Sequence, residues 1–181
     1  MRHTIYLGLG SNVGDRIEFL AAAIRGIADF SWTVVDDVSD VFVTEPVGNV
    51  QQPDFLNVCI SVRTDLDHLT FHSNMKDLEK SIGRTESVRW GPREIDIDLL
   101  FFDSVIVTLP ALTIPHKEIL NRLFVLQPLA QIAPMFLHPV AGKTISELLK
   151  ASNDAHGIER SEHFTSQLLM LINDSITHPT V

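Results

Sequence analysis

Apolar residues alternate with small or polar ones at the start of the chain. Over residues 5–10 this alternation has a period of two, typical of a strand with one buried face that runs into a glycine turn. Residues 17–28 then carry apolar side chains at helical spacing. Ser11 or Asn12 can cap this helix, and Asp15 suits its first turn. The pattern therefore predicts a strand followed by a helix.

Four further segments extend this order. The valine-rich residues 33–43 and the alternating residues 57–63 are typical of strands. Residues 65–81 have the spacing of an amphipathic helix, which Gly83 would end, and residues 93–102 alternate again as a strand. The sequence therefore predicts an α+β fold, a ferredoxin-like βαββαβ antiparallel sheet with helices on one face and the other face open.

Helical spacing returns near the end of the chain. A short helix is predicted near residues 144–151, and an amphipathic stripe follows that consists of Phe164, Leu168, Leu171 and Ile172. We expect one domain over residues 1–150, with residues 151–181 as a C-terminal helical extension of the same domain. This extension would cover exposed apolar surface; the alternative is a helix that forms a dimer or binds a partner.

The charge balance narrows the class of protein. The 181 residues hold 14 Lys and Arg against 23 Asp and Glu, a formal net charge of −9. Non-specific binding to nucleic acid or to an anionic membrane needs a basic excess, so we expect neither partner. No stretch approaches 18 consecutive apolar residues, and the first apolar stretch is too short for a signal peptide. The single Cys59 cannot form an internal disulfide, so we expect a cytoplasmic protein.

Two carboxylates share one face of the most apolar strand. The period of two points Asp96 and Asp98 to the same side, so a cation should face them. Their mutual repulsion, about 2–3 kcal/mol at an effective dielectric near 20, is relieved by Mg²⁺ or by arginine. The alternative is a pair of solvated carboxylates on an exposed strand face.

The neighbourhood of these carboxylates is basic. Five of the fourteen Lys and Arg residues fall within the 39-residue window 84–122: Arg84, Arg89, Arg93, Lys117 and Arg122. A divalent metal on carboxylates, combined with several guanidiniums, is what polyphosphate transfer requires. The alternative is a set of surface ion pairs. Trp90 lies between Arg89 and a Gly-Pro step, where a flat ring is a plausible stacking partner.

Longer segments resemble a known family. They read YLGLGSNVGDR, TEPVGNVQQPDFLN, LEKSIGR, RWGPREIDIDLLFF and PHKEILNRLFVLQPLAQIAP, and they cover roughly residues 4–150. In this order they resemble the 6-hydroxymethyl-7,8-dihydropterin pyrophosphokinases of folate biosynthesis. The resemblance implies a ferredoxin-like fold with three active-site loops, so that residues 1–150 form the pyrophosphokinase domain.

The resemblance implies a reaction and its charged residues. In this family, a pyrophosphoryl group moves from ATP to the pterin hydroxymethyl group, and AMP is released. By resemblance, Asp96 and Asp98 bind two Mg²⁺ ions that bridge the ATP phosphates. Arg84 and Arg93 then hold the transferred group, whereas His116 and Arg122 hold the ATP phosphates.

The pterin site is implied in the same way. Asn57 hydrogen-bonds the pterin ring, and Phe55 lines the pocket. The ring's other edges meet backbone groups around Thr44 and Val47, and its two faces lie between Trp90 and Phe124. Glu79 supports the site from the second helix. Loops over residues 44–55 and 84–92 close over both substrates and exclude water.

The chain departs from the family pattern between its GR and RWGP segments. Glu86 stands where many members carry an arginine, so we expect weaker ATP binding than is usual for the family. Lys117 stands where some relatives have an aromatic residue, and it can offer a phosphate contact instead.

Two other classes of function remain to be weighed. One is a non-catalytic ATP- or pterin-binding regulator, which only Glu86 favours. The other is a ferredoxin-like nucleic-acid module, which the negative charge and the lack of paired aromatic-basic strands disfavour. We expect a free-standing, monomeric enzyme whose substrates are ATP and the pterin; the alternative is a dimer through the C-terminal helix.

Overall fold

A central antiparallel sheet organises the chain. The computed structural model describes residues 2–46, 52–85, 91–154 and 156–177, with side chains through residue 173. Within these ranges six strands form the sheet, in the order β5-β1-β4-β3-β8, and β2 pairs with the other half of β4. Their bounds are β1 His3–Ser11, β2 Thr33–Val38, β3 Val41–Thr44, β4 Phe55–Thr64, β5 Asp96–Phe102 and β8 Ile158–Ser161. Every pairing is antiparallel, as the sequence predicts.

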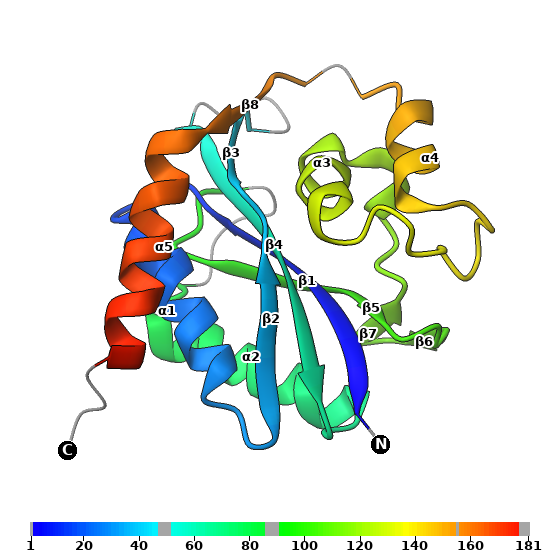
Figure 1. Cartoon of the computed structure of the whole chain (residues 1–181), viewed down its shortest axis with the longest axis horizontal. Coiled ribbons are helices and arrows are strands. Elements are labelled where there is room, and N and C mark those ends of the chain that lie inside the picture. The colour runs from blue at the N-terminus through cyan, green and yellow to red at the C-terminus, as the bar shows by residue number, and fades with distance from the viewer. Residues whose placement is uncertain (1, 47–51, 86–90, 155, 178–181) are drawn as a thin grey trace.

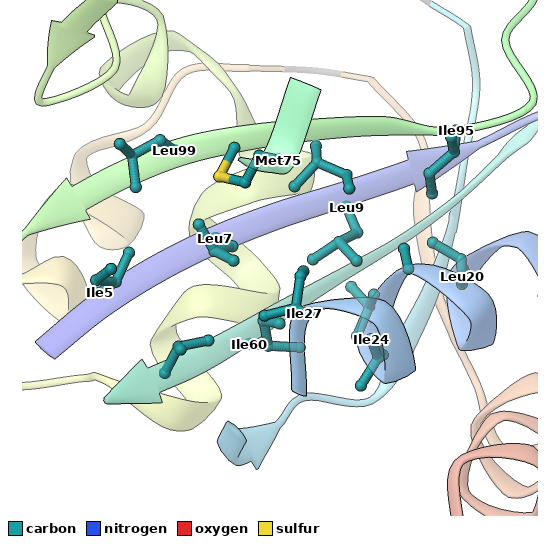
Figure 2. Close-up of a cluster of buried hydrophobic side chains, with 14 of the residues drawn as sticks. Ile5, Leu7, Leu9, Leu20, Ile24, Ile27, Ile60, Met75, Ile95 and Leu99 are labelled. Atoms are coloured by element: carbon teal, nitrogen blue, oxygen red, sulfur yellow. The ribbon is translucent and has the colours of Figure 1, made fainter. Parts of the chain in front are cut away.

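The predicted alternation of β1 is confirmed. Leu7 lies opposite Ile60 of β4 on one side and Leu99 of β5 on the other, and all three side chains are buried. Ile5 and Leu9 point to the same side, where Figure 2 shows them against the residues of neighbouring elements. Because β1 is flanked on both sides, its apolar face forms the middle of the core.

Three helices cover this face of the sheet. They are α1 (Arg16–Ala28), α2 (His68–Ile82) and α5 (Glu162–Thr177). The expected cap of α1 by Ser11 or Asn12 is wrong, because β1 runs through Ser11 and Asn12 is buried. Asp15 caps the helix instead and accepts a hydrogen bond from Glu18 N at 3.2 Å.

The ends of α2 follow the sequence signals. The Asp67 side chain accepts hydrogen bonds from the first-turn amides of Leu69 and Thr70. At the other end Gly83 has a φ of 112°, a left-handed conformation that L side chains rarely adopt. The predicted helix and its glycine stop are therefore confirmed.

The second face of the sheet is not open, and the expectation of helices on one face only is wrong. Helix α3 (Leu123–Ile132) and helix α4 (Ile145–Ala151) pack over this face, on the opposite side of the sheet from α1 in Figure 1. They bury Cys59, Leu100 and Phe101, which point away from the first core. β4 and β5 thus have apolar residues on both faces, and the second set needs its own cover.

The strand expected over residues 33–43 is interrupted. Ser39 is buried between β2 and β3, where its hydroxyl accepts a hydrogen bond from Cys59 N and donates one to Asp40 O. The side chain thus replaces a ladder partner, and the register with β4 also shifts within β2. The result is two short strands on one long partner.

The C-terminal region contributes a strand as well as a helix. β8 pairs with β3, so that Thr44 lies opposite Ile158. α5 packs against α1, and Leu168 of the expected apolar stripe is buried. The sequence patterns did not predict β8, nor the hairpin of β6 (Val107–Leu109) and β7 (Leu112–Ile114).

A single turn of 3-10 helix, η1 (Ile119–Asn121), precedes α3. Among the helices that the structure describes, none has the length and apolar character needed to cross a bilayer.

Candidate functional site

A cleft of about 440 Å³ lies where the two central strands meet the segments around α3. Its floor comes from β1, β4 and β5, and its walls from the residues before α3 and from the C-terminal segment. The lining includes residues from each of these elements: Gly10, Thr44, Phe55, Asn57, Arg93, Asp96, Asp98, Arg122, Phe124 and Asp154. Most of the sequence-predicted site residues that the structure describes therefore share one cleft.

Both aspartates of β5 face this cleft, as the alternation predicts. Asp96 and Asp98 lie opposite Gly10 and Gly8 of β1, while the intervening Ile97 is buried in the core. A Cβ on Gly10 would stand 2.9 Å from Asn57 Oδ1. Because these glycines carry no side chain, the carboxylates border open space on the cleft floor.

Asp96 is held between two arginines. Arg84 Nη1 donates to Asp96 Oδ1 at 2.8 Å, and Arg93 Nη1 contacts Oδ2. The Asp96 side chain is 21% exposed, so the alternative of a freely solvated carboxylate is wrong for this residue. Two guanidiniums therefore lie against one carboxylate at the cleft, where they are placed to bind an anionic ligand.

Glu79 connects this pair to the second helix. Its carboxylate, 3% exposed, contacts Arg84 and accepts hydrogen bonds from Ile97 N at 2.7 Å and Lys76 Nζ at 3.0 Å. Although burial opposes it, the charges of Asp96 and Glu79 raise the pKa of Arg84. Glu79 therefore fixes both the guanidinium and the strand between the two aspartates.

Asp98 is more loosely paired. Arg122 Nη1 lies 3.6 Å from one of its carboxylate oxygens, and His116 Nε2 lies 3.9 Å from the other, both beyond hydrogen-bond distance. Burial raises the pKa of Asp98, and the nearby charge of Asp96 raises it further. Burial also lowers the pKa of His116. A cation that bound closer to Asp98 would therefore stabilise its charged form.

The donor set suits a magnesium ion that a phosphate ligand helps to hold. Mg²⁺ commonly uses one or two protein carboxylates and takes its remaining oxygens from water and substrate phosphates. Asp96 and Asp98 supply two carboxylates beside open space. Within the part of the chain that is described, no cluster of three or more His, Cys, Asp or Glu residues forms a complete metal cage. The residues thus fit a metal site that takes some of its ligands from substrate and water better than one built from protein ligands alone.

We call these six residues the charged end of the cleft: Arg84, Arg93, Asp96, Asp98, His116 and Arg122. Four of them line the cleft directly. Arg84 and His116 do not, but they contact or approach the two lining carboxylates.

Four lining residues that carry no charge, Thr44, Phe55, Asn57 and Phe124, form what we call the neutral end of the cleft. Asn57, which is 7% exposed, donates a hydrogen bond from Nδ2 to Thr44 Oγ1 at 2.6 Å. This bond fixes which way the amide points. The Arg122 guanidinium lies 5.5 Å from the centre of the Phe124 ring, which joins the two ends. An aromatic wall beside an oriented amide can bind a flat ring that has hydrogen-bonding edges.

Four residues singled out from the sequence lie outside the described residues. They are Val47 and Trp90, expected at the pterin, Glu86, expected to weaken ATP binding, and Arg89 of the basic cluster.

Asn12 is a site residue that the sequence patterns missed. Its Oδ1 accepts a hydrogen bond from Arg93 N at 2.8 Å, and its Nδ2 donates to Gln52 Oε1 and Pro53 O, each at 3.1 Å. It therefore ties the backbone of Arg93 to the segment that precedes Phe55. The signal in the sequence is a polar residue directly after the predicted strand, and such a residue is also typical of a helix cap.

Comparisons with known proteins agree with this geometry. Residues 6–134 match the family model described as 7,8-dihydro-6-hydroxymethylpterin-pyrophosphokinase. A Bacillus subtilis protein named 2-amino-4-hydroxy-6-hydroxymethyldihydropteridine pyrophosphokinase is 33% identical, over 92% of this chain and 100% of its own length. A Methylorubrum extorquens protein of the same name is 40% identical, over 87% of this chain and 98% of its own length.

Other relatives are longer. The "Bifunctional protein FolKE" of Lactococcus lactis (strain IL1403) is 38% identical over 88% of this chain, but the match covers only 46% of its own length. The chain therefore spans about half the length of this bifunctional relative. A crystal structure of Plasmodium falciparum HPPK-DHPS superposes with a TM-score of 0.67 at 16% identity, over 83% of this chain and 43% of that one. At this identity the superposition establishes the fold alone.

Proposed function

Because the chain belongs to the 7,8-dihydro-6-hydroxymethylpterin-pyrophosphokinase family, we propose that it transfers pyrophosphate from ATP to 6-hydroxymethyl-7,8-dihydropterin in folate biosynthesis. The products are AMP and the pterin diphosphate. The observation that carries this proposal is the single cleft in which Asp96 and Asp98 lie beside an aromatic and amide-lined end. A polyphosphate and a flat heterocycle can therefore lie next to one another.

The chemical step is a displacement at the β-phosphorus of ATP. The pterin hydroxymethyl oxygen forms a bond to this phosphorus and loses its proton. The bond from the β-phosphorus to the oxygen that bridges the α-phosphate breaks, and AMP leaves with that oxygen. Such transfers ask the protein mainly for alignment and charge stabilisation, so arginines and carboxylates suffice for the protein's part.

Asp96 and Asp98 would hold magnesium, for which we propose two ions. When bound, Mg²⁺ neutralises phosphate charge and lowers the cost of bringing an oxygen nucleophile toward it. Arg84 and Arg93 lie against Asp96, so their guanidiniums are already next to the position of the transferred group. The two guanidiniums would bind oxygens of the transferred group.

Arg122 and His116 would hold the ATP phosphates. Arg122 lines the cleft beside Asp98 and is permanently charged. Burial lowers the pKa of His116, and a neutral imidazole can still donate one N–H to a phosphate oxygen.

The neutral end would hold the pterin. Asn57 reads one edge of the ring, and its hydrogen bond to Thr44 presents the amide in a single orientation. Phe55 and Phe124 supply apolar walls. By family resemblance, Trp90 completes the sandwich with Phe124, and backbone groups near Thr44 and Val47 meet the remaining edges.

We also propose the finer organisation of the chain. If β2 and β3 count as one interrupted strand, the sheet order is that of a ferredoxin-like fold. Residues 1–150 would form the catalytic domain and residues 151–181 its extension, in a cytoplasmic monomer. Light scattering checks the last point, since a dimer through α5 would double the mass.

Analysis of the nucleotide products tests the activity. Purified protein is mixed with ATP, Mg²⁺ and 6-hydroxymethyl-7,8-dihydropterin, and the nucleotides are separated by chromatography. We expect AMP, and only when pterin and metal are both present. Asp96→Ala should abolish AMP formation, whereas Asp77→Ala, which removes an exposed carboxylate on α2, should not. ADP as the product would indicate a different phosphotransfer. Pterin binding without turnover would indicate the non-catalytic regulator.

A further inference from the structure

The C-terminal segment reaches the cleft from outside the region that matches the family model. That match ends at residue 134, yet Asp154 and His156 line the same cleft as Asn57 and Phe124. The segment lies between α4 and β8, and it passes the neutral end before it joins the sheet edge at Thr44. It is therefore a wall of the cleft as well as a connection.

Asp154 makes the contact that matters most. Its Oδ2 accepts a hydrogen bond from Leu123 N at 2.9 Å, and its side chain is only 8% exposed. Leu123 is the first residue of α3, and Arg122, at the N-cap position, supplies no side-chain cap. Asp154 thus caps α3 from 31 residues further along the chain. A carboxylate at this end also interacts favourably with the helix dipole.

The capped residue lies between two residues of the proposed site. Arg122 precedes Leu123 and lines the cleft at the charged end, whereas Phe124 follows it and lines the neutral end. An anchor on the backbone between them restrains both side chains together. Any shift of this backbone would move a phosphate ligand and a pterin wall at the same time.

Asp154 is itself held from the other side. His156 N donates to Asp154 Oδ1 at 3.1 Å, and the His156 ring contacts the same oxygen. One residue further, Gly157 O accepts a hydrogen bond from Glu45 N at 3.3 Å, just beyond Thr44. The carboxylate is therefore fixed between α3 and the end of β3.

From this arrangement we infer that Asp154 is a positioning residue, which fixes Arg122 and Phe124 by capping α3 from the C-terminal segment. The inference rests on the proposed function, because its consequence is read in the binding of ATP and pterin. It makes Asp154, together with its partner His156, part of the active site.

Substitution at Asp154 and at a matched cap tests the inference. Asp154→Ala removes the acceptor, and Asp154→Asn keeps one oxygen in its place. Asp67→Ala is the control, because Asp67 also caps a helix, α2, with no contact to the cleft. We expect Asp154→Ala to raise KM for ATP and for pterin by about fivefold. Asp154→Asn should restore both to within about twofold of the unaltered protein. Asp67→Ala should lower Tm and leave both KM values unchanged.

A second readout needs no substrate. In the free protein, amide hydrogen exchange at Leu123 and in the first turn of α3 should quicken in Asp154→Ala and remain slow in Asp154→Asn. This result is independent of turnover, so a failure of the proposed function and a failure of this inference can be told apart.

Two outcomes would overturn the inference. Unchanged KM values in Asp154→Ala, with only a lower Tm, would make the cap purely structural, as at Asp67. Equal losses in Asp154→Ala and Asp154→Asn, with unchanged exchange in α3, would mean that the charge of Asp154 acts on the substrate directly.

Discussion

At the charged end of the cleft, Asp96 lies between two guanidiniums, and Asp98 lies 3.6 Å and 3.9 Å from its nearest cations. At the neutral end, Asn57 donates to Thr44 Oγ1 at 2.6 Å, and the aromatic side chains beside it carry no charge. One end is a set of charges that balance one another only in part. The other end has its hydrogen bond already in place.

This difference determines how much each end must change when a ligand binds. Under the proposed function, the arginines at Asp96 would exchange a carboxylate for phosphate oxygens. The amide of Asn57 already has a fixed direction, so a ring can bind to it without such an exchange. We therefore expect changes at the charged end to act mainly on turnover, and changes at the neutral end to act mainly on pterin binding.

The largest effect should come from the carboxylates. Asp96→Asn and Asp98→Asn should each lower kcat by about 10³-fold or more, because both remove a negative charge that the proposed metal needs. Initial rates of AMP formation at saturating ATP and Mg²⁺ measure this loss. A loss of less than about tenfold would contradict the metal role.

The same two variants should differ in stability when EDTA has removed metal. Asp98 is a largely buried charge without a hydrogen-bonded cation, so Asp98→Asn should raise Tm. Asp96→Asn should lower Tm, because it removes the ionised partner of Arg93 and leaves Arg84 with Glu79 alone. Thermal unfolding of both variants in EDTA checks these signs, and equal shifts would remove the distinction between the two aspartates.

The next effect concerns Glu79, which holds Arg84 of the charged end in place. Glu79→Ala should lower the free energy of unfolding by about 3 kcal/mol, because it leaves Arg84 and Lys76 without a buried anion and Ile97 N without its acceptor. Denaturant unfolding measures this change. The control is Asp77→Ala on the same helix, which breaks an exposed ion pair with Lys80 and should cost less than about 0.5 kcal/mol. Similar losses in both variants would show that Glu79 is not a central support.

A smaller effect is expected at the neutral end. Asn57→Ala should raise KM for the pterin by about tenfold and leave KM for ATP within about twofold, since the amide is proposed to bind the pterin ring and not the phosphates. Ser61→Ala is the matched control: Ser61 is also buried on β4, and it hydrogen-bonds Asp37 away from the cleft. Steady-state kinetics with each substrate varied in turn measure both constants. Equal rises in the two KM values would mean that the ends are not separate.

Local periodicity was enough to predict much of the fold. The alternation in β1 and β5 and the glycine stop of α2 depend on neighbouring residues, and each is found in the structure. The break at Ser39 depends on Cys59, and the strand β8 depends on the free edge of β3. Such features follow from distant partners, which a linear pattern does not contain.

The residues of the candidate site also fall into those that local spacing predicts and those whose role depends on distant partners. That Asp96 and Asp98 share a face follows from period-two geometry alone. That Asn12 contacts the backbone of Arg93, 81 residues away, and that Asp154 caps α3, depend on how the chain folds back on itself. Residue types that suit many roles, such as Asn and Asp in loops, give no sign of which distant amide they will meet.

The smallest predicted effect concerns Glu86, an acidic residue between Arg84 and Arg93 in the sequence, where the family resemblance implies a basic residue in many members. Glu86→Arg should lower KM for ATP by about threefold, because it replaces repulsion of the polyphosphate by attraction, and KM for the pterin should stay constant. Glu86→Gln removes only the repulsion and should give about half of this change in binding free energy. Because salt screens long-range attraction between charges, the advantage of Glu86→Arg should shrink as ionic strength rises from about 0.05 M to 0.5 M. If ATP KM and turnover are both unchanged in Glu86→Arg, the residue does not influence the nucleotide, and the charged end alone determines its affinity.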